Sequence, residues 1–141
     1  MKTAHILHLY NRAGFGALPS QVGMLASLSQ KQIIDRLFDT SRGASPMKMD
    51  LSVFKPMLDK DYKSIKGPQR KQLAKLARDK TRELNTLWID RMVNTSEDLR
   101  ERMTLFWANV FVCRENNVWF ALRYNNLLRK HALGNFRDFT K

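Results

Sequence analysis

The sequence has a single cysteine and no long apolar run. Cys113 stands alone among 141 residues, so neither an internal disulfide nor a cysteine-based metal site can form. Its apolar neighbours in VFVCR predict a buried thiol. No apolar run approaches the roughly 18 residues needed to span a bilayer, and no secretory signal is visible at the start. We expect a cytoplasmic chain as it stands, or an exported one if a signal has been removed.

Signatures of catalysis are also missing. The sequence contains no glycine-rich phosphate loop followed by Lys-Ser/Thr and no Gly-x-Ser-x-Gly turn. Its 13 acidic residues include no closely spaced pair in an apolar setting. His5 and His8 are neighbours on a helix, but two ligands do not make a zinc site. The sequence therefore predicts no catalytic residue, cofactor or metal, and it leaves open whether the protein is an enzyme.

Positive charge is abundant and unevenly placed. The formal net charge is +12, and residues 55–82 carry ten Lys/Arg against three Asp. Four of these cations are spaced four, three and four residues apart and share one helix face: Lys71, Lys75, Arg78 and Arg82. The face has two interpretations, a solvated outer surface or a polyanion-binding surface that follows a phosphate backbone.

Apolar residues make up 43% of the chain, which excludes wholesale disorder. They recur at helical spacing along most of its length. This pattern predicts helices over 3–13, 19–28, 30–39, 69–93, 97–112 and 118–133, with a further short helix from Phe136. The expected fold is an all-α, irregular, partly orthogonal bundle of six to seven helices in one domain (1–141). Short helices occupy 1–39, an irregular linker 40–68, and the basic helix plus the core helices 69–141.

The helix after Ser96 is predicted to be central and buried. Its apolar stripe runs through Leu99, Met103, Phe106 and Val110, with Trp107 beside it. The following helix should share this core, with the basic helix outside. Lys80 projects into the apolar side of the basic helix, so its ammonium group needs a partner or a path to solvent.

Three segments resemble a known family. They are NRAGFG (Asn11 to Gly16), ERMTLFWANVF (Glu101 to Phe111) and LLRKHALGNFRDF (Leu127 to Phe139). Their order and rough spacing are similar to the bacterial domain-of-unknown-function 1800 family. The resemblance implies a mostly helical protein with no settled activity. Family members are usually several times longer and often look exported, with a sulfatase-like partner encoded nearby. We therefore expect the chain to be the N-terminal part of a longer protein.

The family often has two histidines where this chain has Ala108 and Val110, so any role of theirs cannot be carried over. The positions that do match are carried over without a role: Arg12, Gly14, Gly16, Arg102, Trp107, Asn126, Arg129, His131, Gly134, Asn135, Arg137 and Asp138.

Seven of these residues form a candidate polar or anion-binding cluster: Arg102, Asn126, Arg129, His131, Asn135, Arg137 and Asp138. Such residues among apolar helices either join neighbouring helices by ion pairs or line an anion pocket. Glu101 or Asp90 is the expected counter-charge.

Three functions remain open. The first is a helical scaffold or interaction module, whose partner is the remainder of a longer chain or a co-encoded protein. The second is binding of nucleic acid or another polyanion through helix 69–93. The third is part of an enzyme whose site needs a C-terminal region. If Leu133, Phe136 and Phe139 are uncovered, the chain is also expected to self-associate through them.

Overall fold

The structure is a computed structural model that describes residues 1–54, 65–114 and 117–140. The described residues form seven α-helices and one short 3-10 helix, without a strand, which confirms the predicted all-α class. The elements are α1 (Thr3–Ala13), α2 (Pro19–Ala26), α3 (Gln30–Thr40), η1 (Ser52–Phe54), α5 (Pro68–Asn94), α6 (Asp98–Val110), α7 (Val118–His131) and α8 (Phe136–Phe139). Part of the predicted irregular linker, 55–64, lies outside the described residues. None of the helices that are described has the length and apolar character needed to cross a membrane.

Local signals explain where several helices begin. Pro19 and Pro68 occupy the first turns of α2 and α5, where a missing N–H costs nothing. α3 begins with a reciprocal cap: the Gln32 N–H donates to Ser29 Oγ (3.3 Å), and the Ser29 N–H donates to Gln32 Oε1 (2.9 Å). At α8 the Asn135 side chain accepts from the Arg137 N–H (2.8 Å). These starts lie within about two residues of those predicted from sequence.

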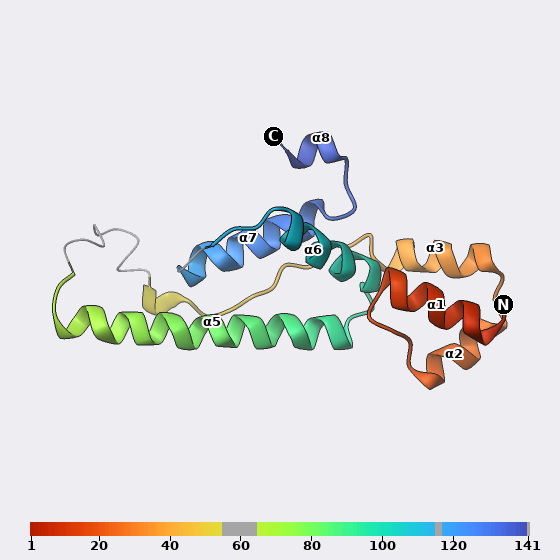
Figure 1. Cartoon of the computed structure of the whole chain (residues 1–141), viewed down its shortest axis with the longest axis horizontal. Helices are drawn as coiled ribbons and strands as arrows, with labels where there is room; N and C mark the ends of the chain where they lie inside the picture. The colour runs from red at the N-terminus through yellow and green to blue at the C-terminus, as the bar shows by residue number, and fades with distance from the viewer. Residues whose placement is uncertain (55–64, 115–116, 141) are drawn as a thin grey trace.

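The helices form an elongated arrangement with α6 at its centre (Figure 1). α1, α2 and α3 gather at one end, while α5 runs along one side and α7 lies across from it. α6 packs against α1, α3, α5 and α7, so it joins the two ends of the molecule. α8 lies on the side of α6 and α7 that faces away from α5 (Figure 1).

Two separate apolar clusters hold these parts together. The first joins α1, α2 and α3 through Ile6, Tyr10, Leu25, Ile33 and Leu37. The second joins the segment before α5 to α5 and α7 through Met47, Leu51, Phe54, Leu84 and Val118. Burying each such side chain contributes about 1.5–3 kcal/mol. α5 packs through Leu84 and keeps its cationic face outside, as predicted.

The orientation of α6 differs from the prediction. Phe106 and Val110 are 50% and 51% exposed, while α6 buries its polar residues Arg100, Glu101 and Thr104. The helical period was correct, but the expected inward side was wrong. A buried charge is tolerated when it is paired and hydrogen-bonded, and α5 and α7 supply the partners for α6.

Three further side chains refine the predictions. Cys113 is exposed rather than buried, because it follows the end of α6 where the chain crosses the surface. Trp107 is half-buried, and its indole N–H donates to the Ala132 carbonyl (3.1 Å). Lys80 has found a partner, since its ammonium group lies 2.8 Å from Glu83 Oε2.

Candidate functional site

The structure brings together only part of the predicted polar cluster. Arg129 Nη1 donates to Asn126 Oδ1 at 2.9 Å, so these two residues do meet. Arg102 lies elsewhere, with its guanidinium 5.6 Å from the centre of the Phe15 ring. The His131 ring stacks on Phe139 with 5.7 Å between centres. Asn135 caps α8, and Arg137 and Asp138 are exposed on that helix.

Glu101 is the centre of the buried polar network. Its Oε1 accepts from Arg91 Nε (2.7 Å) and Arg129 Nε (2.6 Å). Its Oε2 accepts from Trp88 Nε1 (3.1 Å) and Arg129 Nη2 (2.9 Å). Glu101 and Arg129 are both fully buried. We call Trp88, Arg91, Glu101 and Arg129 the Glu101 cluster; it joins α5, α6 and α7.

The surroundings of Glu101 keep it ionised. Burial alone would raise the pKa of this carboxyl. The hydrogen bonds and positive charges of Arg129 and Arg91 outweigh burial and hold the pKa below its ordinary value. Each carboxylate oxygen already has two donors, and the side chain does not reach solvent. Glu101 therefore has a structural role and is not placed to bind or react with a ligand.

Arg100 extends this network to the backbone. Its Nε donates to the Ser41 carbonyl (2.8 Å), and its Nη1 donates to the Arg129 carbonyl (2.6 Å) near the end of α7. Burial lowers the pKa of Arg100, and the neighbouring acidic residues Glu97 and Glu101 oppose that change. A cation at a helix C-terminus pairs with carbonyls that have no partner inside the helix.

Asn126 connects the same network to the segment before α5. Its Oδ1 accepts from the Met47 N–H (2.8 Å), and its Nδ2 donates to the Met47 carbonyl (3.0 Å). The same Oδ1 accepts from Arg129. One amide therefore fixes an extended segment to α7, as a neighbouring strand would in a sheet.

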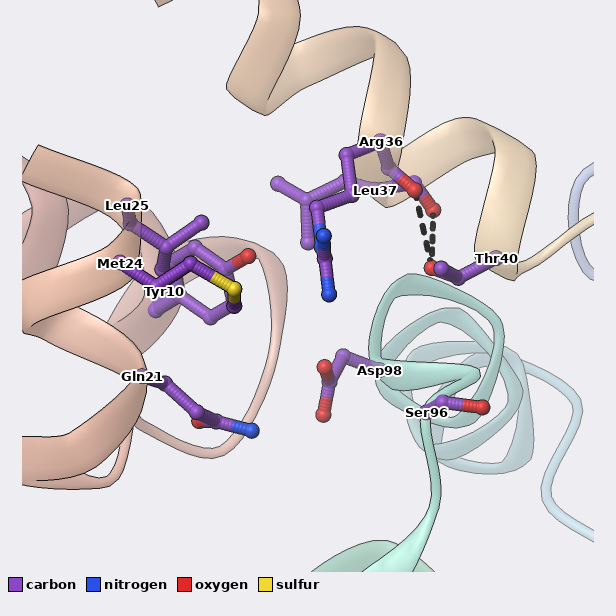
Figure 2. Close-up of a pocket in the computed structure, with 9 residues that line it drawn as sticks. All are labelled: Tyr10, Gln21, Met24, Leu25, Arg36, Leu37, Thr40, Ser96 and Asp98. Atoms are coloured by element: carbon purple, nitrogen blue, oxygen red, sulfur yellow. Dashed lines mark hydrogen bonds between the residues drawn. The ribbon is translucent and has the colours of Figure 1, made fainter. Parts of the chain in front are cut away.

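A small cavity lies where α1, α2 and α3 meet the beginning of α6. Its volume is about 60 Å³. Figure 2 shows polar side chains around it from four helices: Tyr10 from α1, Gln21 from α2, Arg36 from α3 and Asp98 from α6. The apolar side chains of Leu25 and Leu37 line it as well.

The charges at this cavity are poorly compensated. Burial raises the pKa of Asp98 above its ordinary value. Burial also raises the pKa of Tyr10, with a smaller opposing influence from Arg36 and a smaller raising influence from Asp98. In the described parts of the chain, the Asp98 carboxylate, the Arg36 guanidinium and the Tyr10 hydroxyl have no hydrogen-bonded protein partner. These three groups are therefore available to a ligand, unlike Glu101.

Gly14 allows α1 to approach the start of α6 beside this cavity. A Cβ atom at position 14 would lie 3.1 Å from the Asp98 Cβ and 3.2 Å from the Tyr10 carbonyl oxygen. Both distances are tighter than an ordinary van der Waals contact, so a side chain there would require its neighbours to shift by a few tenths of an ångström. The NRAGFG segment thus has a packing role next to Asp98, which sequence alone did not reveal.

A surface groove runs along the outer side of α7. One part, of about 350 Å³, lies beside Cys113 and Phe120, and the other, of about 400 Å³, lies beside Pro46 and Lys130. Arg123 and Leu127 line both parts. We call this surface the α7 groove. Its apolar and cationic residues alternate on one face of the helix.

The predicted cationic face of α5 is at the surface. Lys71, Lys75, Arg78 and Arg82 are all exposed, and Arg82 lies 3.5 Å from Asp79. Within the described residues, no group of three His, Cys, Asp or Glu side chains is placed to hold a metal ion.

Comparison with known proteins identifies the family. No curated protein and no solved structure matches the chain. A family model described as "Protein of unknown function (DUF1800)" matches residues 8–141, which is essentially the whole chain and includes the Glu101 cluster, the cavity and the α7 groove. The chain is thus a helical member of the DUF1800 family.

Proposed function

We propose that the protein is a helical interaction module that binds a partner helix in the α7 groove. The observation that carries the proposal is the composition of this groove. Phe120, Arg123, Leu127 and Lys130 follow one another at intervals of three, four and three residues, so they share one face of α7. Phe120 and Leu127 are 48% and 51% exposed. A row of apolar anchors at this spacing suits an amphipathic helix.

The amount of exposed surface supports the same proposal. The accessible surface of the chain is 9935 Å², whereas a folded monomer of 16.5 kDa is expected to expose about 7,500 Å². The excess is larger than the roughly 800 Å² that each partner contributes to a standard interface. Phe106 and Phe136 add further exposed aromatic surface on α6 and α8.

The positive charges of the α7 groove indicate which kind of partner helix would bind there. Arg123 and Lys130 flank the apolar anchors, and the chain as a whole carries a net charge of +12. A helix with leucines on one face and acidic residues beside them would complement both features. Such a helix could come from the remainder of a longer chain or from a co-encoded protein, and the two sources present the same chemistry.

A designed peptide tests the proposal. The probe is a tryptophan-free peptide of about 16 residues, long enough to form a helix, with leucines at helical spacing and glutamates beside them. We expect saturable binding, measured by the fluorescence anisotropy of a label on the peptide. Phe120→Ser and Leu127→Ser should each weaken binding at least about tenfold. The matched control is Phe38→Ser, which removes a phenyl ring of 53% exposure from α3.

The charge of the groove can be tested separately. Arg123→Glu should weaken binding of the acidic peptide, whereas Lys71→Glu on α5 changes the net charge equally and should leave it nearly intact. Absence of saturable binding, or equal losses with the groove and control variants, would remove the proposal.

The exposed cations of α5 favour a second candidate function, binding of a polyanion. Lys71, Lys75, Arg78 and Arg82 all reach solvent on one long helix. Anisotropy of labelled single-stranded DNA, titrated at several salt concentrations, tests this candidate. Affinity should fall steeply with salt, and replacing Lys71 and Lys75 by glutamine should reduce both the affinity and the salt slope. No binding at low salt would exclude it.

A further inference from the structure

The cavity beside Asp98 is bordered by opposite charges that do not neutralise each other directly. Figure 2 shows the Arg36 side chain extending into the space from α3 and the Asp98 carboxylate facing it from the start of α6. In the described part of the chain, no ion pair joins Arg36 to Asp98. The space between them is therefore polar at both ends and open to a bridging molecule.

Four neutral polar side chains also line the cavity. The Thr40 hydroxyl donates to the Arg36 and Leu37 carbonyls, and the Ser96 hydroxyl points away from the space, which leaves Tyr10 and Gln21 (Figure 2). The Tyr10 ring is almost fully buried, at 5% exposure, so its hydroxyl is held in place by the first apolar cluster. The Gln21 side-chain oxygen accepts from the Leu18 N–H (3.0 Å), which leaves its NH₂ group directed toward the cavity. The cavity therefore offers two hydrogen-bond donors in addition to the two charges.

The volume limits what can enter. A space of about 60 Å³ accommodates on the order of four to six atoms of the size of a water molecule. Leu25 and Leu37 supply an apolar wall, which suits a short carbon segment between polar ends. A ligand with a single charge would neutralise one side chain and be repelled by the other.

We propose that this cavity binds a small zwitterion of the α-amino acid class, with its carboxylate at Arg36 and its ammonium group at Asp98. Glycine has five non-hydrogen atoms and carries both charges at the required ends. The Tyr10 hydroxyl and the Gln21 amide donate to the ligand carboxylate. Ligands with a long side chain are disfavoured, because they exceed the volume of about 60 Å³. This site is independent of the α7 groove and of the function proposed for it.

Titration of the 141-residue chain with glycine tests the proposal. Chemical shifts of the amides around Tyr10, Arg36 and Asp98 are followed by two-dimensional NMR of ¹⁵N-labelled protein. We expect saturable shifts with a roughly millimolar dissociation constant, because a ligand of this size makes few contacts. L-Alanine should bind similarly, and L-leucine should not bind. Acetate and methylammonium, which each carry one of the two charges, should bind at least about tenfold more weakly.

Substitutions at each end provide the second test. Arg36→Gln and Asp98→Asn should each weaken glycine binding at least about tenfold. The matched controls are Lys31→Gln and Asp35→Asn, which make the same charge changes at an exposed pair on α3. If Arg36→Gln or Asp98→Asn does not fold, the comparison of glycine with acetate, methylammonium and L-leucine on the unaltered chain still tests the proposal. Unsaturable shifts with glycine, equal binding of acetate, or equal losses in the control variants would each overturn the proposal.

Discussion

The end of the molecule formed by α1–α3 and its middle are held together by different interactions. At one end, α1, α2 and α3 surround an apolar cluster that includes Ile6, Leu25 and Ile33. In the middle, α5, α6 and α7 meet around Glu101 and Arg129, which are charged and fully buried. The comparison shows that helices of one chain can be assembled by apolar packing or by a closed set of ion pairs. The cost of disruption differs, because an unpaired buried charge costs more than a vacated apolar volume.

The largest effect is expected from opening the Glu101 cluster. Glu101→Ala leaves Arg129 buried without a counter-charge and removes a partner of Arg91. We expect a loss of about 3–5 kcal/mol in the free energy of unfolding, measured by urea denaturation. The control is Glu83→Ala, whose side chain is 46% exposed in its pair with Lys80, with an expected change within about 0.5 kcal/mol. Similar losses for both variants would contradict a dominant role for the buried cluster.

A somewhat smaller effect is expected at the apolar end. Ile33 is fully buried between α1 and α2, so Ile33→Ala should cost about 3 kcal/mol through lost contacts and a new cavity. Phe38→Ala, on the exposed side of the same helix, should cost much less. Hydrogen exchange would show whether protection is lost in α1–α3 while it persists in α5–α7. Uniform loss of protection would mean that the two ends unfold together.

The smallest expected effect is a difference in how the stability of the Glu101 cluster and of the first apolar cluster depends on pH. The pKa of Glu101 is lowered in the folded state from an ordinary value of 4.5, so its ionised form stabilises the fold. That contribution is complete above about pH 4.5 and is lost as the pH falls through the lowered value. The difference in the free energy of unfolding between the unaltered chain and Glu101→Gln, measured by urea denaturation, should therefore decrease at acidic pH. The corresponding difference for Ile33→Ala should stay nearly constant over the same pH range.

The features that could be predicted from the sequence are those set by local interactions. The helices predicted from residues 19 and 30 begin there, because Pro19 and the Ser29–Gln32 cap act on neighbours within a few residues. Such short-range patterns are visible in a sequence. The outward position of the α5 cations could be predicted for the same reason.

The inward side of α6 could not be predicted in this way. Glu101 is buried because Arg91, ten residues away, and Arg129, 28 residues away, approach it in space. Spacing within one helix also could not show that Arg100 is buried while Arg102 lies over Phe15. Since apolar residues usually face the core, Phe106 and Val110 were assigned to the inside.

The cavity was beyond sequence analysis for a related reason. Tyr10, Arg36 and Asp98 are spread over the first 98 residues and come from three helices. None belongs to a recognisable motif for ligand binding. The α7 groove differs, because Phe120, Leu127 and Lys130 are close in the sequence. The helix that carries them was expected to share the core, and only the structure shows that no described helix covers this face.

The bidentate contact between Asn126 and Met47 has a consequence for recognition. Pro46, one residue before this contact, forms a wall of the α7 groove. The amide of Asn126 is itself held by the buried Arg129. The wall formed by Pro46 is therefore fixed in place before a ligand binds. The proposed partner helix would therefore meet a surface of fixed shape, and the groove itself would lose little conformational entropy on binding.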